Sequence, residues 1–374
     1  MLGSRSRALA AVLGLASIAT LGLLGFARVS QVPSATAAPV VTAAPPQQPE
    51  PAAKPPEPEG PPRFEETLDV SSFLRGNIHT HSSWSDGDKH PKHVYAWYRN
   101  HGYAFVALTD HENRASPETF KALERKNFTI IAGEEITMTV DGHPVHVNGL
   151  CTRKTIAAGG RYPTKKEALA HAVESVRAQG GVALVNHPNF DWALTIDDVR
   201  EARGAQLLEI WSGHPYVNTE GDAERPSHEA IWDTLLASGE RFAGVAVDDT
   251  HHIGLPKKAG TGARPGKGWI EVFGDKTEKA SICGALAKGQ LYSSSGVTLK
   301  RIRVEETALS VWPKEKGAIV EFIGAGGTVL EKIERVADGQ ATYRLRGDER
   351  YVRARITTPD GKKAWTQAYF VTRK

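Results

Sequence analysis

Histidine, aspartate and glutamate side chains with the spacing of metal ligands concentrate in one stretch of this 374-residue chain. All 14 histidines lie between His79 and His252, and the sequence beyond them contains none. The motifs are His79-Thr80-His81 followed by Asp86, Asp110-His111, Glu134-Glu135 with His146, Asn186-His187-Pro188, and Asp248-Asp249 with His251-His252. Imidazole nitrogens and carboxylate oxygens without thiolates suit Zn, Mn or Fe. The motifs therefore predict a metal site with more than one ion.

The elements that would position these motifs alternate between strands and helices. Short apolar runs predict strands that end at His79 or span 104–108, 128–132, 146–150, 182–185, 207–211 and 242–247. Helical patterns span 91–100, 117–125, 165–179, 196–203, 229–237 and 278–288. Repeated strand-then-helix order indicates a parallel sheet with helices outside, and about seven repeats favour a closed or distorted barrel. The motifs follow strands, where a barrel gathers its active-site loops.

In this order the motifs resemble the PHP (polymerase and histidinol phosphatase) family. The resemblance covers about Leu74 to Val297 and includes the late stretch 287–296, AKGQLYSSSG. It implies an α/β fold, a distorted (β/α)7 barrel, and two or three divalent metal ions (Zn, Mn or Fe). The implied ligands are His79, His81, Glu134 and Asp249 for one metal, Glu134, His146 and His187 for a second, and Asp86, His111 and His251 for a third. The family often has histidine where this chain has Asp86.

Several further residues are candidates for roles near the metals. Glu135 is expected to support the barrel or the ligands, and Asp110 and Asp248 to orient imidazoles by hydrogen bonds. The candidates for binding or protonating the substrate are His143, His214 and His252, with Arg114 as a cation for an anionic substrate. The remaining histidines, which stand on or beside helix patterns, are expected to be structural or solvated; they are His90, His93, His101, His171 and His228.

The favoured function is hydrolysis of a phosphate monoester or diester by metal-activated hydroxide, with a small anionic molecule as substrate. One alternative is a carboxylic ester or carbamate hydrolase similar to carbaryl hydrolases. A second is a binding protein without catalysis. The formal net charge is only +3, so no specific nucleic-acid binding is expected. The sequence does not indicate an oligomeric state.

The N-terminal region predicts export from the cytoplasm. Arg5 and Arg7 precede an apolar run from Ala8 to Phe26, and the small-residue pattern 35–37 could be a cleavage site. Residues 1–33 are thus a signal peptide or an uncleaved membrane anchor, and the folded part is expected to be periplasmic or secreted. Residues 34–63 are rich in proline and alanine and predict a linker. The barrel is expected over 64–298.

After residue 298, short alternating runs predict a small antiparallel, β-sandwich-like domain over 299–374. Asp360-Gly361 is a hairpin-turn signal within it. Cys151 and Cys283 are the chain's two cysteines, too few for a disulfide scaffold or a thiolate metal site. Sequence does not say whether they approach each other, and we expect two free, buried thiols.

Overall fold

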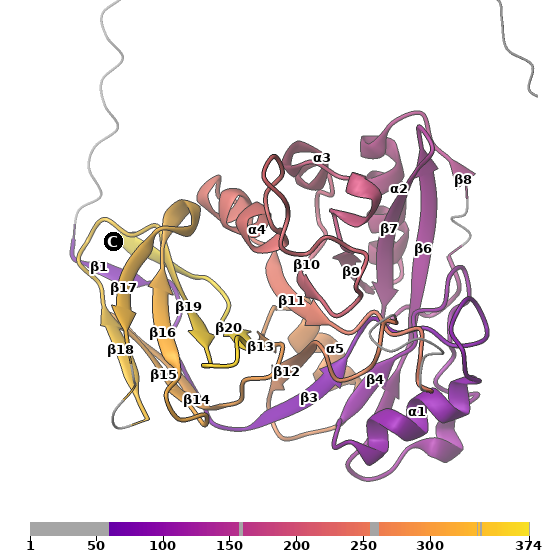
Figure 1. The fold of residues 1–374 in the computed structure, drawn as a ribbon, viewed down its shortest axis with the longest axis horizontal. Helices are drawn as coiled ribbons and strands as arrows, with labels where there is room; N and C mark the ends of the chain where they lie inside the picture. Colours follow the sequence, from indigo (N-terminus) through magenta and orange to yellow (C-terminus); the bar gives the residue numbers. More distant parts are fainter. Residues whose placement is uncertain (1–59, 157–159, 255–261, 335, 337–338, 374) are drawn as a thin grey trace, which may run out of the picture. The chain divides into compact units, whose positions relative to one another are not determined.

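The strands that carry the motifs are divided between two sheets (Figure 1). The computed structural model describes residues 60–156, 160–254, 262–334, 336 and 339–373. In the first sheet, three strands run parallel and two extend them antiparallel: β3 (Phe73–Asn77), β4 (Phe105–Ala107) and β5 (Thr129–Ile131), then β12 (Trp269–Phe273) and β13 (Leu291–Ser294). This sheet therefore keeps the predicted parallel order in β3 to β5 alone.

The second sheet combines three parallel strands with an antiparallel hairpin. The parallel strands are β9 (Val182–Val185), β10 (Leu207–Ser212) and β11 (Ala243–Val247). Next to β9 lies the hairpin of β7 (His143–Leu150) and β6 (Gly133–Val140), and β8 (Gly160–Arg161) pairs with β6. Residues 133–135, expected in a loop, thus begin a long strand. Single parallel bridges, Thr80 with Thr250 and His111 with Glu135, join the two sheets. The described strands form mixed sheets, and a closed barrel remains a prediction.

The helices lie close to their predicted positions, with one exception. They are α1 (Pro91–Asn100), α2 (Lys165–Ala178), α3 (Ile196–Arg200), α4 (His228–Ala237) and α5 (Lys279–Ala287). Thr164 caps α2 as expected, because its side chain accepts a hydrogen bond from the Glu167 N–H. The helix predicted over 117–125 is reduced to a single 3₁₀ turn, Lys121–Leu123, because the backbone of Glu124 turns extended. None of the described helices is long and apolar enough to cross a bilayer.

Apolar side chains fill the space between the two sheets and the space under the helices. Leu184, Val245, Ile270 and Ile282 belong to one buried cluster that contains residues of both sheets and of α5. A second cluster packs α2 and α4 against the outer face of the second sheet. Burial of this apolar surface is the main stabilising contribution to the fold. The polar motifs lie at the strand ends and in the β6–β7 hairpin.

The C-terminal strands are antiparallel, as predicted. They are β14 (Leu299–Glu305), β15 (Ala308–Pro313), β16 (Ile319–Ile323), β17 (Val329–Ile333), β18 (Ala341–Arg344), β19 (Tyr351–Thr357), β20 (Lys363–Trp365) and β21 (Tyr369–Arg373). They gather to one side of the α/β part in Figure 1. One apolar cluster packs their two sheets together. Gly361, with φ of 80°, lies in the turn between β19 and β20.

The C-terminal strands are continuous with the first sheet, because β20 pairs with β13. Two N-terminal strands also join them. β1 (Pro62–Phe64) pairs with β21, and β2 (Leu68–Val70) pairs with β14. Pro62 and Arg63, expected in the linker, therefore belong to a strand. Residues 57–374 form one compact unit, so the boundary expected at residue 298 remains a prediction. The predicted signal or anchor segment lies outside the described residues.

The expectation of two free thiols was wrong. Cys151, at the end of β7, and Cys283, in α5, form a disulfide with a Cα–Cα distance of 6.1 Å. They stand 132 residues apart in sequence. The pairing depends on α5 packing across the ends of both sheets, a contact that no local sequence pattern reveals. The disulfide thus joins the second sheet to the helix that covers the first.

Candidate metal centre

The β6–β7 hairpin presents a face of polar side chains to the interior. Side chains alternate along a strand, so Glu135 and Thr137 share one face of β6. His146 pairs with Thr137 across the hairpin, and Asn148 pairs with Glu135. Cross-strand partners lie on the same face, so these four side chains point the same way. The hairpin alone therefore supplies a carboxylate and an imidazole to one site.

Glu134 faces the opposite side of β6, away from the imidazoles. Both of its carboxylate oxygens accept hydrogen bonds from the Ile156 N–H, at 3.0 and 3.2 Å. Burial raises the pKa of the Glu134 carboxyl to about 7, against the lowering effects of that hydrogen bond and of Arg114. The place expected for Glu134 is taken by Glu135, because the pairing of β6 with β7 puts the second glutamate on the same face as His146.

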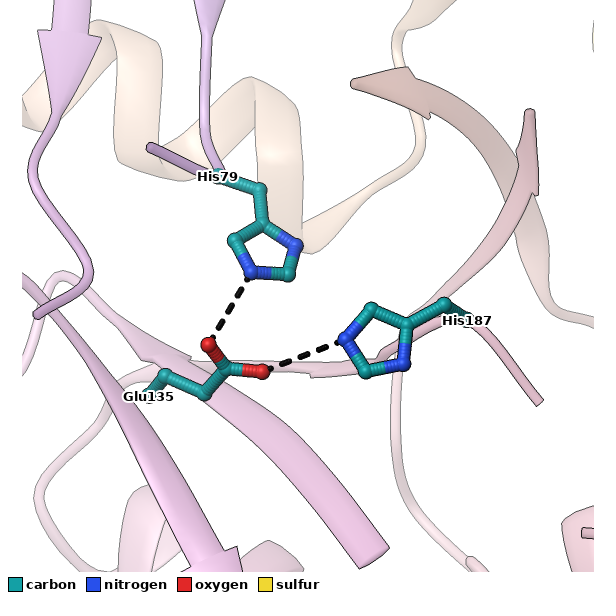
Figure 2. Close-up of side chains that lie close together, drawn as sticks. All are labelled: His79, Glu135 and His187. Carbon is teal, nitrogen blue, oxygen red and sulfur yellow. Dashed lines mark hydrogen bonds and ion pairs between the residues drawn. The ribbon is translucent and has the colours of Figure 1, made fainter. Parts of the chain in front are cut away.

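The Glu135 carboxylate lies at the centre of the cluster, shared between imidazoles from several strands. Figure 2 shows its two oxygens facing different rings: Oε2 lies 3.1 Å from Nε2 of His79, and Oε1 lies 3.3 Å from Nε2 of His187. Oε1 is also 2.8 Å from Nδ1 of His146, and Oε2 is 3.1 Å from Nε2 of His81. The Asn186 side chain donates to Oε1 at 2.7 Å and fixes the carboxylate. Such a shared carboxylate can bridge two cations.

Asp249 forms a second meeting point, at the end of β11. Its Oδ1 lies 3.4 Å from Nε2 of His79 and 3.3 Å from Nε2 of His81. The backbone of Asp249 adopts φ of 47°, a left-handed conformation that is uncommon for residues other than glycine. Such strained backbone persists where the surrounding structure holds it, often at functional sites. The geometry places His79, His81 and Asp249 in one potential ligand group.

The Asp86 carboxylate contacts the more exposed imidazoles of the cluster, those of His111 and His251. Its Oδ2 lies 3.2 Å from Nε2 of His251 and 3.6 Å from Nε2 of His111. Its Oδ1 lies 3.3 Å from Nδ1 of His81. Asp86 is half exposed, whereas the Glu135 group is buried. The three residues expected from the resemblance to share a third metal therefore do lie together, at the open side of the cluster.

The imidazole nitrogens and carboxylate oxygens of the cluster are better placed to bind divalent ions than to form hydrogen bonds with one another. Nε2 of His81 and Nδ1 of His146 are buried and make no hydrogen bond of acceptable geometry to any described residue. Both nevertheless lie close to a Glu135 oxygen. Short separations without hydrogen-bond geometry are expected where lone pairs converge on a common point. The buried histidines, glutamate and aspartates thus have an arrangement consistent with a polynuclear metal site.

The electrostatics of the cluster favour positive charge. Burial lowers the pKa of the His81 imidazole, but the carboxylates of Asp249 and Glu135 outweigh burial and raise it to about 10. Burial similarly opposes a rise for His79, whose pKa is held well above its ordinary value by Asp249, Glu135 and Glu209. The imidazoles in turn hold the pKa of Glu135 well below its ordinary value despite burial. The negative potential of these carboxylates would favour bound metal cations in place of protons on the imidazole rings.

Glu209, which the sequence analysis did not single out, orients His79. Its Oε1 lies 2.5 Å from Nδ1 of His79, and its Oε2 accepts a hydrogen bond from the backbone N–H of His187 at 3.0 Å. A carboxylate on one ring nitrogen fixes the tautomer and directs the other nitrogen toward a metal. The available signal was a lone carboxylate in the apolar strand 207–211, where a charged group is costly unless it has a partner.

Two of the four residues expected to act on substrate have other partners. The Arg114 guanidinium donates two hydrogen bonds, at 3.0 and 2.7 Å, to the carbonyl oxygen of Thr152. It therefore stabilises the chain after β7. His143 is exposed at the start of β7, and its Nδ1 lies 2.9 Å from Oδ2 of Asp191. Neither side chain lines the cavity over the cluster.

His214 and His252, the other two residues expected to act on substrate, line the cavity over the cluster. This cavity has a volume of about 270 Å³. Its walls combine the acidic and imidazole groups with one apolar ring; they are His81, Asp86, His111, Glu135, His146, His187, Phe190, His214, Asp249, His251 and His252. Burial lowers the pKa of His214 to about 4, with Asp249 opposing and His251 adding to the shift. His214 is therefore neutral near pH 7. The buried Nδ1 of His252 has no hydrogen-bond partner among the described residues.

Asp110 and Asp248 stabilise loops instead of imidazoles. Asp110 accepts hydrogen bonds from the N–H and the hydroxyl of Ser82, at 2.7 and 2.6 Å, and from the Ser85 hydroxyl. Asp248 accepts from the Tyr98 hydroxyl at 2.9 Å and from backbone N–H groups at 267 and 268. The loops that carry Asp86 and Asp249 are thereby held in place.

No protein-family model and no curated protein matches this chain. Among solved structures, it is similar to a two-domain protein from Bacteroides vulgatus that contains a predicted PHP-like metal-dependent phosphoesterase. The identity is 14% and the TM-score 0.43, over 85% of this chain and 100% of the other. An amidohydrolase from Chromobacterium violaceum, with bound sulfate and no metal, matches at 16% identity and a TM-score of 0.37, over 48% and 88%. At these low TM-scores, function is inferred from the residues of the site.

Proposed function

We propose that this protein hydrolyses phosphate esters at a site for two or three divalent metal ions. The observation that carries the proposal is the Glu135 carboxylate, whose two oxygens face different sets of imidazoles. Asp249 faces two of the same rings, His79 and His81. A bridging carboxylate between adjacent cation sites is suited to phosphoryl groups, which need charge neutralised on several oxygens at once. The expected ions are Zn, Mn or Fe.

The roles of the chain's own residues follow from their positions. His79, His81, His146, His187, Glu135 and Asp249 would hold two ions, and Asp86, His111 and His251 a third. Bound ions would supply an activated water and positive charge for the substrate. His214 is neutral and lines the cavity, so it can share a hydrogen bond with a substrate oxygen without adding charge. Glu209 holds His79 in one tautomer.

The proposed location is outside the cytoplasm, with residues 1–33 as a signal peptide or membrane anchor. The Cys151–Cys283 disulfide supports this location, because disulfides persist mainly in oxidising compartments. Mass spectrometry of the N-terminus of the exported protein would distinguish a cleaved signal from an anchor.

The test compares His79→Ala with His93→Ala, which removes an exposed imidazole from α1. Metal content is measured by plasma mass spectrometry, and activity with bis-p-nitrophenyl phosphate and p-nitrophenyl phosphate. His79→Ala is expected to lose at least one metal equivalent and about 100-fold or more in kcat/KM. His93→Ala should retain both. Unchanged activity in His79→Ala would reject the metal site as the catalytic centre.

The same assay with p-nitrophenyl acetate separates the proposed activity from carboxylic ester hydrolysis. Both reactions use a metal-activated water, so the metal content alone does not distinguish them. Turnover of the acetate without turnover of either phosphate ester would replace the phosphoesterase proposal with the ester or carbamate hydrolase. Metal binding without turnover of any of the three would favour a binding protein.

A further inference from the structure

A row of aromatic rings leads from the buried metal cluster to the surface on one side of the cavity. The Phe190 ring packs against the rings of His187 and His146, with centroids 5.2 and 6.0 Å away. Phe190 then meets His214 edge to face at 6.4 Å, and His214 meets Tyr216 at 5.6 Å. The row therefore begins at two expected metal ligands and ends at a tyrosine ring.

Tyr216 is unusually exposed for an apolar ring. It is 62% accessible, and among the described residues only Trp84 and Val329 are other large hydrophobic side chains in the exposed class. Its neighbour Val217 is 1% accessible and fixes the segment to the core. His214 lines the cavity and its ring contacts Tyr216, so the exposed tyrosine ring extends this wall toward solvent.

The two loops that carry the row are fixed to each other. The side chains of Asn189 and Asn218 each donate a hydrogen bond to the other residue's carbonyl oxygen, both at 3.1 Å. Asn189 donates also to the Pro226 carbonyl at 2.9 Å. Asp191 and Trp192 hold left-handed φ values of 50° and 53° directly after Phe190. Phe190 and Tyr216 therefore lie on a preorganised wall, which reduces the entropy lost when a ligand binds.

The cavity size limits what can lie against this wall. A volume of about 270 Å³ is near the lower end of small-molecule sites. This size suits a small ligand, such as an ester with one phosphoryl group and one ring. Aromatic rings bind other planar rings through stacked or edge-to-face contacts.

We propose that Phe190, His214 and Tyr216 form a leaving-group subsite that selects small esters whose alcohol carries an aromatic ring. This inference rests on the proposed function, since it places the phosphoryl group at the metals. The metal end of the cavity would bind the anionic group, and Tyr216 would contact the ring at the solvent side. Specificity within the ester class is then set by this wall and not by the metal ligands.

The experiment measures binding of two non-hydrolysable ligands, benzylphosphonate and methylphosphonate, to the metal-loaded full chain by calorimetry. The wild type should bind benzylphosphonate about 10-fold more tightly than methylphosphonate. Tyr216→Ala should reduce this ratio about 5-fold, and Tyr216→Phe should preserve it because the ring remains. Val329→Ala, an exposed apolar residue of β17, is the matched control and should leave the ratio unchanged.

Equal affinities in the wild type, or an unchanged ratio in Tyr216→Ala, would overturn the subsite. Failure of the proposed function looks different: neither phosphonate binds and no phosphate ester is hydrolysed. KM for 2-phenylethyl acetate and ethyl acetate then provides the same comparison, because the two alcohols have similar leaving-group chemistry. A preference for the phenylethyl ester that falls in Tyr216→Ala would support the subsite on an ester hydrolase. If the wild type showed no such preference, the subsite would be overturned for an ester hydrolase as well.

Discussion

Glu134 and Glu135 are adjacent in the sequence but face opposite sides of β6, so a pair of conservative variants separates their roles. Glu135→Gln removes the charge shared among five imidazoles, and we expect loss of at least one bound metal and about 100-fold or more in kcat/KM. Glu134→Gln keeps an acceptor for the Ile156 N–H and should retain both properties. Metal analysis and kinetics on the two variants check this. The reverse result would move the bridge to Glu134.

Glu209 touches no proposed substrate, so its substitution should change catalysis through His79. Glu209→Gln keeps the shape but weakens the charge-assisted contact to Nδ1 of His79. The expected effect is a 10- to 100-fold loss of metal affinity or activity. Metal affinity is measured by competition with a chelator, and KM and kcat are measured at saturating metal. Restoration of kcat by excess metal would show that Glu209 acts mainly on binding; no change in affinity or kcat would contradict its positioning role.

His228 makes folding stability depend on pH. Its ring is buried and accepts a hydrogen bond from the Asn189 N–H at 3.2 Å, and burial lowers its pKa to about 3. As pH falls below about 6.5, the unfolded chain takes up a proton that the folded chain refuses, so stability is lost. The slope is at most about 1.4 kcal/mol per pH unit, and the loss ends near pH 3.

The variant His228→Gln isolates the contribution of His228 to the pH dependence of stability, because glutamine can accept the same hydrogen bond without titrating. Between pH 7.5 and pH 5, the wild type should lose about 2 kcal/mol more unfolding free energy than the variant. Urea unfolding at the two pH values measures the difference. A difference between the proteins that is the same at both pH values would rule out His228 as the source.

At the scale of elements, a buried ion network joins α4 to β19. Arg353 is fully buried, and its guanidinium lies 2.7 Å from Glu229 and 2.6 Å from Asp233. Arg353→Met would leave the buried Asp233 carboxylate without a cation, whereas Glu229 would keep its pair with Arg355 at 3.1 Å. Breaking a buried ion pair on one side costs about 3–5 kcal/mol. Lys166→Met, which breaks an exposed pair with Glu201, is the control and should cost at most about 1 kcal/mol. Similar small losses in both variants would show that Arg353 is not essential to the junction.

The position of this network connects the C-terminal strands with the site. α4 begins at His228, directly after the segment that contains His214 and Tyr216. Lys363 of β20 also lies 3.2 Å from Glu220 in that segment. The C-terminal strands thus support the element on which one wall of the cavity depends. The C-terminal strands therefore pack against the α/β part of the chain.

At the scale of the whole molecule, the disulfide links distant parts of the α/β region. Because Cys151 and Cys283 are 132 residues apart, their bond restricts a large loop in the unfolded chain. Replacing both with alanine should lower the unfolding free energy by about 2–5 kcal/mol. Addition of a reductant should destabilise the wild type by a similar amount and leave the double variant unchanged. Equal stability of oxidised and reduced wild type would show that the bond contributes nothing.

Residue types and their spacing in the sequence predicted most of the candidate ligands and most of the order of strands and helices. His79, His81, His111 and His187 follow apolar strands, and such placement is readable because strand ends and polar motifs are local features. Helices α1 and α2 were equally readable, since helical spacing, a proline start and the Thr164 cap lie within one short segment. The residues of the candidate metal site were thus predicted largely from type and spacing.

Three features depend on tertiary packing: which glutamate faces the imidazoles, which carboxylate supports His79, and whether the two cysteines pair. A one-residue shift in the pairing of β6 with β7 would move every side chain of β6 to the opposite face, and no local pattern fixes this register. Glu209 and the disulfide depend on strands and helices that meet only after packing. The aromatic wall from Phe190 to Tyr216 likewise arises from two loops that are separate in sequence, and it exists because Asn189 and Asn218 hold them together.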